Sequence, residues 1–434
     1  MNNKLSFLLE AKANGKYIGV PSFCTANRMA IKACMQYAKK NSQLVIFEAT
    51  ANQVNQDGGY TGMKPHQYID FIEKIADEVG FDKSQIVFGG DHLGPLTWSH
   101  LNEEEAMKNA EILVSQYIRS GFTKIHLDTS MKLACDPKDE PLAEETVASR
   151  GARLMKVCMD SFAEYQAEHP DADHPVYIIG SEVPIPGGAE SNEEELNVTD
   201  PKAMEKTYMV YQEVFNKNGL SDALDYIIGI VVQPGVEFSD GDVHVYSSEK
   251  ATDLSKKIKE IPNLVLEGHS TDYQPRVALK KMVQDGVAIL KVGPALTFAV
   301  RAGLFALVSI EEKVVVESKR SNLVSVIDQK MDENNKNWIK HYHGTAEEIK
   351  LKRHYSYSDR LRYYLSDPHI ENAIDELLKN IDQYKDSIPF GLLHQYMPEQ
   401  YFKVRDGLLN YDAESLVLDW VHTFIEDYYL ACQA

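Results

Sequence analysis

The sequence reads Ile86-Val87-Phe88-Gly89-Gly90-Asp91-His92-Leu93-Gly94-Pro95 at the point that decides its fold. The apolar run that opens this stretch predicts a buried β-strand, and the polar pair Asp91-His92 follows at its carboxyl end. In a barrel of alternating strands and helices, the active site lies at the carboxyl ends of the strands. Residues 86–95 therefore predict a barrel strand and a place for chemistry at its end.

Seven further short apolar runs occur along the chain, and most of them end in a polar residue. Helical stretches lie between the runs. Because the runs are nearly continuous in Ile, Val, Leu and Phe, they are typical of parallel strands that are covered on both faces. Eight such units in series predict an α/β fold, a (β/α)8 TIM barrel. The other runs are 18–23, 44–48, 124–128, 176–182, 227–233, 263–267 and 287–292, and the helical stretches are 28–40, 65–79, 103–120, 144–168, 201–217, 247–260 and 274–285.

A doubly wound open sheet is the structural alternative to a barrel. Such a sheet usually carries a Gly-rich dinucleotide loop after its first strand. The corresponding residues are Val20-Pro21-Ser22-Phe23-Cys24, which do not form such a loop. After residue 310 the pattern changes to helical, aromatic-rich segments. We therefore expect a barrel over residues 1–310 and a helical C-terminal extension, packed on the barrel, over residues 311–434.

The composition of the 434-residue chain narrows its class. The net charge of −20 argues against nucleic acid as a partner, since binding to its phosphates needs clustered Lys and Arg. Five cysteines at irregular spacings, without a Cys-x-x-Cys motif, favour a reducing compartment. The chain opens without a signal peptide, and no apolar run reaches the roughly 20 residues that cross a bilayer. We expect a cytoplasmic protein that binds neither nucleic acid nor membranes.

Polar residues follow the predicted strands along the whole barrel. A single polar residue at the end of a strand would mean little. Eight strands that each place such a residue at the same rim of the barrel predict an active site there. The residues on which this prediction rests are Glu48, Asn52, Gln53, Asp91, His92, Asp128, Glu182, Gln233, His269, Ser270, Asp272 and Lys291.

Three of these side chains suit a divalent metal ion. His92 and His269 offer imidazole ligands and Glu182 a carboxylate, a set that fits Zn²⁺ or a similar ion. The alternative is that each His only forms hydrogen bonds near the barrel mouth. Asp91 could exchange a proton with a substrate hydroxyl, or it could orient His92. Asp128 and Asp272 stay open between catalysis and support of other residues.

The loops after the seventh and eighth strands are candidates for phosphate binding. Ser270 and Gly293 lie there, and loops at this place often bind phosphate through backbone N–H groups at a helix N-terminus. Ordinary turns have a similar composition. In the extension, Arg360 (near Arg362) and Arg405 could contact a phosphate, or they could belong to surface salt bridges. The Gly-rich tract after Asn52 and Gln53 is suited to binding sugar hydroxyls or is a flexible turn.

Six long motifs carry a resemblance to a known family. Together they closely resemble the Z-type subunit family associated with D-tagatose-1,6-bisphosphate aldolase, and the resemblance covers nearly the whole chain. That family is similar to the class II, zinc-dependent fructose-bisphosphate aldolases, which are (β/α)8 barrels. The motifs lie at residues 48–63, 89–95, 182–189, 232–238, 269–274 and 291–298.

The resemblance implies roles for individual residues. Asp91 resembles the catalytic acid/base of those aldolases, His92 and His269 resemble metal ligands, and Glu182 a carboxylate at the metal site. The loop over 268–271 and the turn after Lys291 resemble the phosphate loops. One position departs from the pattern, since Gln233 stands where another His ligand is expected. A neutral amide binds zinc less well than imidazole, so Mn²⁺ or Mg²⁺ becomes a candidate beside Zn²⁺.

Members of this family have been assigned three roles. These are an accessory subunit that stabilises a separate catalytic aldolase chain, a tagatose-6-phosphate kinase, and a metal-dependent 4-epimerase of ketohexose phosphates. A kinase needs a nucleotide phosphate loop, and neither G-x-x-x-x-G-K-[ST] nor a kinase-type Gly-rich loop occurs here. We therefore expect retro-aldol chemistry on a phosphorylated ketohexose, most concretely 4-epimerisation between D-tagatose 6-phosphate and D-fructose 6-phosphate. The alternative is a non-catalytic subunit that stabilises a class II aldolase chain. Expected partners are thus the sugar phosphate, a possible aldolase chain and further copies in a homo-oligomer.

Overall fold

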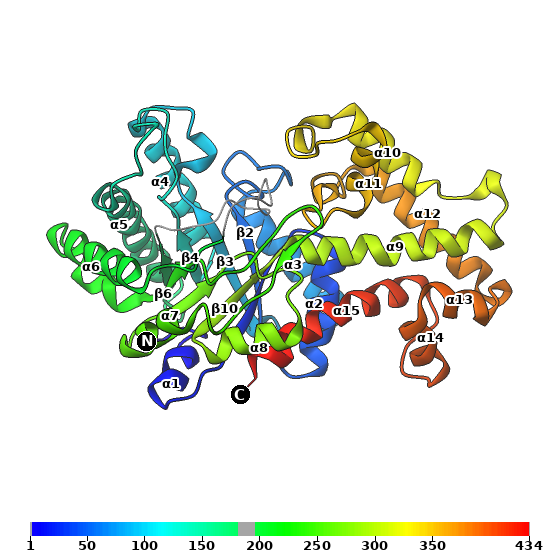
Figure 1. The fold of residues 1–434 in the computed structure, drawn as a ribbon, viewed down its shortest axis with the longest axis horizontal. Helices are drawn as coiled ribbons and strands as arrows, with labels where there is room; N and C mark the ends of the chain where they lie inside the picture. The colour runs from blue at the N-terminus through cyan, green and yellow to red at the C-terminus, as the bar shows by residue number, and fades with distance from the viewer. Residues whose placement is uncertain (1, 181–195, 434) are drawn as a thin grey trace.

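The polypeptide closes into a barrel of eight parallel strands with a large helical extension on one side (Figure 1). The computed structural model describes residues 2–180 and 196–433. Around the barrel, the strand order is β1-β10-β9-β6-β5-β4-β3-β2, so each strand pairs with its neighbours in the sequence of units and the last strand returns to the first. The predicted (β/α)8 barrel is confirmed.

All eight predicted strands are present, with small shifts at their ends. Each is buried along almost its whole length, which explains why the sequence shows continuous apolar runs there. The barrel strands are β1 (Val20–Cys24), β2 (Val45–Thr50), β3 (Ile86–Leu93), β4 (Lys124–Leu127), β5 (Val176–Ile179), β6 (Ile227–Val232), β9 (Val265–Gly268) and β10 (Val287–Val292).

A helix follows every barrel strand, as the helical stretches of the sequence predict. The largest difference lies after β6, where the helix begins at Thr252 instead of residue 247 because a short hairpin, β7 (Glu237–Phe238) and β8 (Val243–His244), precedes it. The barrel helices are α2 (Arg28–Lys40), α3 (Pro65–Val79), α4 (Glu103–Arg119), α5 (Glu144–Glu168), α6 (Pro201–Lys217), α7 (Thr252–Glu260), α8 (Arg276–Gln284) and α9 (Pro294–Val314).

The amino-terminal end of the barrel is closed by the start of the chain. Helix α1 (Phe7–Ala13), which the sequence pattern did not predict, lies below the strands in Figure 1. Leu5 and Leu8 are buried there in an apolar cluster with Val20, Ile46 and Val265 of the strands. Because this end is filled with aliphatic side chains, solvent and ligands reach the barrel interior from the opposite end.

The chain beyond the barrel is helical, as expected. The boundary expected at residue 310 falls inside α9, which leaves the barrel and continues into the extension (Figure 1). The further elements are α10 (Leu323–Glu333), α11 (Ala346–Tyr355), the 3-10 turn η6 (Arg360–Tyr363), α12 (Pro368–Tyr384), α13 (Phe390–Tyr396), α14 (Pro398–Arg405) and α15 (Ala413–Cys432).

Several elements of the extension, among them α12, α13, α15 and η6, pack against the barrel helices. Helix α15 packs against α2, α8 and α9, while α12 packs against α9. Helix α9 is long and apolar enough to cross a membrane, but 67% of its most apolar window is buried inside the protein. The apolar character of α9 is therefore that of a core helix.

Candidate active site

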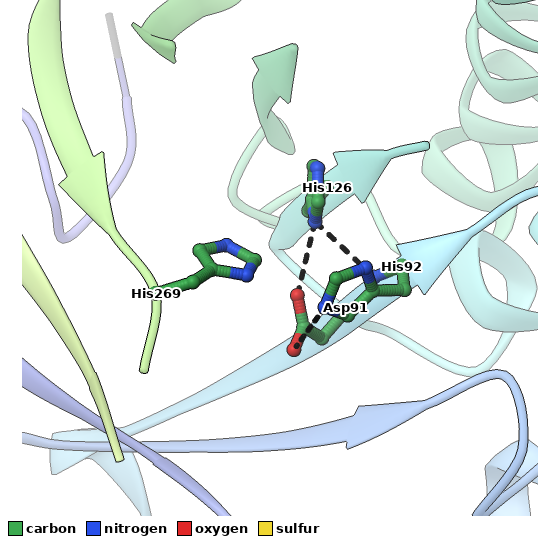
Figure 2. Close-up of side chains that lie close together, drawn as sticks. All are labelled: Asp91, His92, His126 and His269. Atoms are coloured by element: carbon green, nitrogen blue, oxygen red, sulfur yellow. Dashed lines mark hydrogen bonds and ion pairs between the residues drawn. The ribbon is translucent and has the colours of Figure 1, made fainter. Parts of the chain in front are cut away.

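Strand β3 extends three residues beyond the predicted end and carries Asp91 and His92 on its last residues. Its pairing with β4 shifts between Gly90 and Leu93. Within this shift the backbone of His92 adopts a φ of 48°, in the left-handed region that a residue with a side chain rarely adopts. Such strain is often found where a side chain must be aimed at a functional site. Here it places His92 toward the barrel axis next to Asp91 (Figure 2).

Two histidines are held by carboxylates at one ring nitrogen each. His92 Nδ1 lies 2.9 Å from Asp128 Oδ2, and His269 Nε2 lies 2.9 Å from Glu267 Oε1. The rings meet edge to face, with centroids 4.9 Å apart. A carboxylate behind a histidine fixes its tautomer and leaves the second nitrogen as a metal ligand. His92 Nε2 and His269 Nδ1 are thereby available in the site.

A third histidine, His126 of β4, completes the cluster. Its Nδ1 lies 3.0 Å from Asp91 Oδ1 and 3.2 Å from the backbone nitrogen of His92. Its Nε2 is buried and has no hydrogen-bond partner in the part of the chain that the structure describes. Ligand atoms of Asp91, His92, His126 and His269 all lie within 4.8 Å of one another (Figure 2). Imidazoles with one carboxylate are a donor set that suits Zn²⁺ and related divalent ions.

The sequence interpretation missed His126, although a signal was present. Strand β4 and the next residue read Lys124-Ile125-His126-Leu127-Asp128, an alternation of polar and apolar residues. Side chains of a strand alternate between its two faces, so all three polar residues point to the same side. Lys124, His126 and Asp128 indeed all contact residues of the barrel interior.

Asp91 lies between the histidines and a lysine. Its Oδ2 is 3.0 Å from Lys291 Nζ and accepts a hydrogen bond from Cys24 Sγ at 3.4 Å. Burial would raise the pKa of Asp91, but the charges of His92 and Lys291 hold it well below its ordinary value. The carboxylate is therefore ionised at neutral pH and can accept a proton.

For His269, burial lowers the pKa instead of raising it. It lowers the pKa of the imidazole to about 4, so His269 is neutral at physiological pH. Neutral imidazole is the form that binds metal ions. For Asp128, burial would raise the pKa, but the hydrogen bond with His92 and the charge of that ring keep it below its ordinary value.

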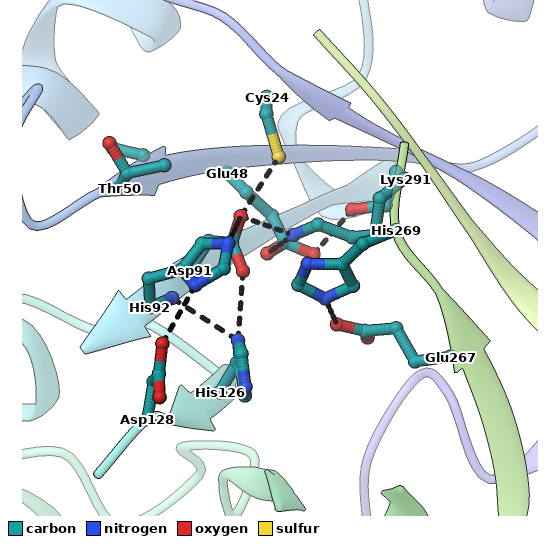
Figure 3. A network of polar contacts seen from close by, with 12 residues as sticks. Cys24, Glu48, Thr50, Asp91, His92, His126, Asp128, Glu267, His269 and Lys291 are labelled. Atoms are coloured by element: carbon teal, nitrogen blue, oxygen red, sulfur yellow. Dashed lines mark hydrogen bonds and ion pairs between the residues drawn. The ribbon is translucent and has the colours of Figure 1, made fainter. Parts of the chain in front are cut away.

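A network of buried ion pairs lies next to the cluster (Figure 3). Lys124 Nζ lies 2.7 Å from both Glu48 Oε1 and Glu267 Oε2, and Lys291 pairs closely with Glu48 Oε2. Lys124, Glu48 and Glu267 are completely buried. Positive and negative groups alternate through the network, which offsets the cost of removing each charge from water. The network fixes both Asp91 and the carboxylate behind His269.

A cavity of about 1010 Å³ opens above the cluster, between the barrel mouth and the extension. This is the upper end of the size range of small-molecule sites. Its walls include residues far apart in the sequence, from the loop after β2 to η6 and α12. Most of the predicted substrate-binding residues line it: Asn52, Gln53, Ser270, Asp272, Lys291, Gly293 and Arg360, together with Asp91, His92 and His269.

The structure does not bring every predicted residue into this cavity. Gln233 Oε1 accepts hydrogen bonds from the backbone N–H groups of Gly235 and Val236, at 2.8 and 2.9 Å, and stabilises its own turn. Asp128 is among the buried neighbours of His92 and not among the residues that line the cavity. Arg405 lies on α14, with its guanidinium over Phe390 at 5.2 Å, and is also absent from the lining. Glu182 lies outside the described residues.

This chain is similar in sequence to one known family and to one solved structure. A family model described as D-tagatose-1,6-bisphosphate aldolase subunit GatZ/KbaZ-like matches residues 5–433. A crystal structure described as a probable tagatose 6 phosphate kinase from Sinorhizobium meliloti 1021 is 42% identical, covers 95% of this chain and 100% of its own, and superposes with a TM-score of 0.86.

Two aldolase structures are more distant. The YdjI aldolase from Escherichia coli K12 is 13% identical, with 88% of this chain and 97% of that chain covered and a TM-score of 0.40. Fructose-bisphosphate aldolase from Campylobacter jejuni is 14% identical, with 88% and 93% covered and a TM-score of 0.44. Since the family model spans the barrel, the site and the extension, the chain belongs to the D-tagatose-1,6-bisphosphate aldolase subunit GatZ/KbaZ-like family.

Proposed function

We propose that this protein is a metal-dependent enzyme that converts D-tagatose 6-phosphate and D-fructose 6-phosphate into each other by inverting C4. The observation that carries the proposal is the pair of carboxylate-supported histidines next to an ionised Asp91, inside one large cavity. A purely structural role would not require polar groups with free ligand atoms to converge in a buried place, where each one costs free energy.

His92 and His269 would hold the metal ion, with His126 close enough to complete its coordination and Asp91 beside it as the acid/base. When bound, a divalent ion polarises the C2 carbonyl of the sugar and stabilises the negative charge that develops on its oxygen. The imidazole-rich donor set supports Zn²⁺, with Mn²⁺ as the second candidate. Because Gln233 uses its amide oxygen in its own turn, it is not part of the proposed ligand set.

Asp91 is the proposed acid/base. It takes the proton of the C4 hydroxyl while the C3–C4 bond breaks, which leaves an enediolate on C1–C3 and an aldehyde at C4. The aldehyde rotates within the cavity and presents its other face to C3. The C3–C4 bond forms again, and Asp91 returns the proton to the C4 oxygen. Asp128 would act as a positioning residue through His92, since it contacts the ring nitrogen opposite the site.

A direct assay tests this proposal. The purified chain is incubated with Zn²⁺ or Mn²⁺ and fructose 6-phosphate in D₂O, and the products are followed by NMR. Tagatose 6-phosphate that retains hydrogen at C4 is expected, because the C4 hydrogen stays on the aldehyde throughout. A product that carries deuterium at C4 would contradict the retro-aldol route. His92→Ala should abolish turnover, while His66→Ala on the exposed surface of α3 serves as the matched control.

The family description favours a second candidate, a subunit that supports a separate aldolase chain. The same preparation distinguishes the two. A chain that is inactive alone with either metal, but that raises the activity or stability of a class II aldolase, would be such a subunit. In that case His92→Ala should leave the support of the partner unchanged. Activity of this chain with ATP is not expected, because it lacks a nucleotide phosphate loop.

A further inference from the structure

The usual place for a phosphate in a (β/α)8 barrel is filled by the protein itself. Helix α9 follows the last strand, and its first N–H groups would normally bind the anion. Asp272 Oδ1 accepts from the N–H of Gly293 at 3.0 Å and from the N–H of Ala295 at 2.8 Å. Pro294 has no N–H, and the N–H of Leu296 donates to the Gly293 carbonyl. A carboxylate therefore occupies the position that a phosphate would take.

Among the described residues, the cavity lining holds a different cationic group that has no counterion. Arg360 of η6 lines the cavity and is only 8% exposed. Its Nε is buried without a hydrogen-bond partner, and no described carboxylate lies within 4.0 Å of its guanidinium. A buried and unpaired charge is costly, and this cost is removed when an anion binds. In a chain with a net charge of −20, such a free guanidinium is unexpected unless it serves a ligand.

The neighbouring residues keep Arg360 free. Asp359, the nearest carboxylate in sequence, turns toward α9, where its Oδ2 accepts from Thr297 Oγ1 at 2.7 Å and its Oδ1 lies 3.4 Å from Arg301 Nε. The backbone N–H of Arg360 donates to Tyr342 Oη at 3.0 Å. Together these contacts anchor the start of η6 while the guanidinium of Arg360 remains directed at the cavity lining.

A second guanidinium lies beside the first. Arg362 also lines the cavity, and its Nη1 donates to the carbonyl of Asp359 at 2.8 Å. The guanidinium carbons of Arg362 and Arg360 lie 4.5 and 5.9 Å from the centroid of the Tyr363 ring. Arg362 Nη2 donates to Tyr363 Oη at 3.0 Å, so Arg362 contributes chiefly its charge, and the two guanidinium groups together match the charge of a phosphate dianion.

The other charges that the described residues bring to the lining offer no second site of this kind. Lys291 is already paired with Glu48 and Asp91, and Arg28 is paired with Glu78. Toward the outside, α12 contributes two carboxylates to the wall, Glu371 and Asp375. A second phosphate in that part of the cavity would be repelled by these groups.

We infer that Arg360 and Arg362 of the C-terminal extension form the phosphate site of this protein, in place of the α9 N-terminus, and that the site takes a ketohexose with one phosphate rather than two. The identity of the sugar rests on the proposed function, whereas the location of the anion site does not. The extension is then part of the ligand site and not only a support of the barrel.

Binding measurements on the full-length, metal-free protein at pH 7.5 test this inference. Isothermal titration with fructose 6-phosphate should give an affinity about 10- to 100-fold higher than with fructose, because charge-assisted hydrogen bonds are lost with the phosphate. Fructose 1,6-bisphosphate should bind no more tightly than the monophosphate. A bisphosphate that binds more than tenfold more tightly would overturn the assignment to a single phosphate.

Variants locate the site. Arg360→Gln should lower the affinity for fructose 6-phosphate by about 10- to 100-fold, and Arg360→Lys by less, because lysine keeps the charge but not the planar fork. The matched control is Arg119→Gln. In the wild type, Arg119 at the end of α4 forms a surface ion pair with Glu164 of α5. A thermal melt verifies that each variant is folded, and Arg362→Gln replaces Arg360→Gln if the latter is not.

The outcomes separate this inference from the proposed function. His92→Ala should lose turnover but retain the affinity of the metal-free protein for fructose 6-phosphate. If Arg360→Gln and Arg362→Gln both bind fructose 6-phosphate with wild-type affinity, the anion site lies elsewhere, whether or not the enzyme turns over. If the variants lose affinity and the wild type shows no turnover, the site stands and the epimerase proposal falls.

Discussion

The two ends of the barrel interior differ in chemistry although the same strands form both. At the amino-terminal end the inward residues are aliphatic and pack against Leu5 and Leu8. Two residues further along four of these strands, the inward side chains are polar or charged. The pairs are Val20 and Ser22, Ile46 and Glu48, Val265 and Glu267, and Ile289 and Lys291.

This difference shows how one barrel separates stability from function. The aliphatic layer gains free energy from burial alone and needs no particular partner. The charged layer is stable only because its members pair with one another, so each residue depends on its neighbours. Changes in the aliphatic layer should therefore be tolerated, while changes in the charged layer should affect both stability and chemistry.

The largest effect on turnover is expected at Asp91 in the charged layer. Asp91→Asn removes the proposed acid/base, and kcat should fall by about 10²- to 10⁴-fold. The measurement is the rate of conversion of fructose 6-phosphate at saturating metal. Asp139→Asn, in an exposed loop, is the matched control. A variant that retains more than a tenth of the wild-type kcat would exclude Asp91 as the acid/base.

Removal of a charge from the buried network should be the largest change in stability. Lys124→Met leaves Glu267 without its cation, and the free energy of unfolding should fall by about 3–5 kcal/mol. Urea unfolding measures this change. In the control, Lys156→Met, an exposed pair with Asp160 is lost, and the change should stay below about 1 kcal/mol. Equal effects of the two variants would mean that the buried network contributes no more than a surface pair.

Asp272 provides a test by pH. Burial raises its pKa to about 6 from an ordinary value of 3.8, so the folded protein binds this proton more tightly than the unfolded chain. The contribution of Asp272 to stability is therefore greatest at low pH and is lost as the pH rises from about 4 to 6. Asp272→Asn removes this dependence and should gain up to about 3 kcal/mol relative to the wild type across that window. Urea unfolding at several pH values would show a constant difference if the carboxyl were not perturbed.

A smaller effect is expected from the support of a histidine. In Asp128→Asn a neutral amide replaces the charged carboxylate that accepts the hydrogen bond from His92 Nδ1. The affinity for Zn²⁺ should therefore fall by about 10- to 100-fold. The affinity is measured by competition with a chelator, and the free energy of unfolding of the metal-free protein serves as a second readout. A loss of stability with unchanged metal affinity would assign Asp128 a purely structural role.

The smallest effect is expected in the aliphatic layer. Ile289→Val removes one methyl group next to the charged layer, and the free energy of unfolding should fall by only about 0.5–1.5 kcal/mol. Turnover and phosphate affinity should not change. A large loss of turnover in this variant would show that the two layers are coupled and that the separation described above does not hold.

The barrel could be predicted from the sequence because its signal is local. Every strand is a short buried run that is followed by a helix, and both features are visible in a window of a few residues. The residues at the ends of these runs were visible for the same reason, and Asp91, His92 and His269 do lie together. The α1 closure and the hairpin after β6 were not predicted, because neither carries a strong periodic pattern.

The partners of these residues could not be read from single strands. Lys291 lines the cavity, but its ion pairs with Glu48 and Asp91, which lie 243 and 200 positions earlier in the sequence, could not be read from its own strand. His126 was hidden within a strand whose inward face only the closed barrel defines. Arg360 and Arg405 looked alike in sequence, and the packing of η6 and α14 places only Arg360 at the cavity.

The sequence by itself determined the eight strands, their helices and the chemical groups delivered to one rim, because the hydrophobic effect acts on neighbouring residues in a fixed period. Only the tertiary structure decided which carboxylate supports which histidine, and which cation has no counterion among the described residues. Those choices depend on distances between side chains from different strands and from the extension. Electrostatic interactions of buried groups change strongly over a few ångströms, and such distances exist only after the chain has folded.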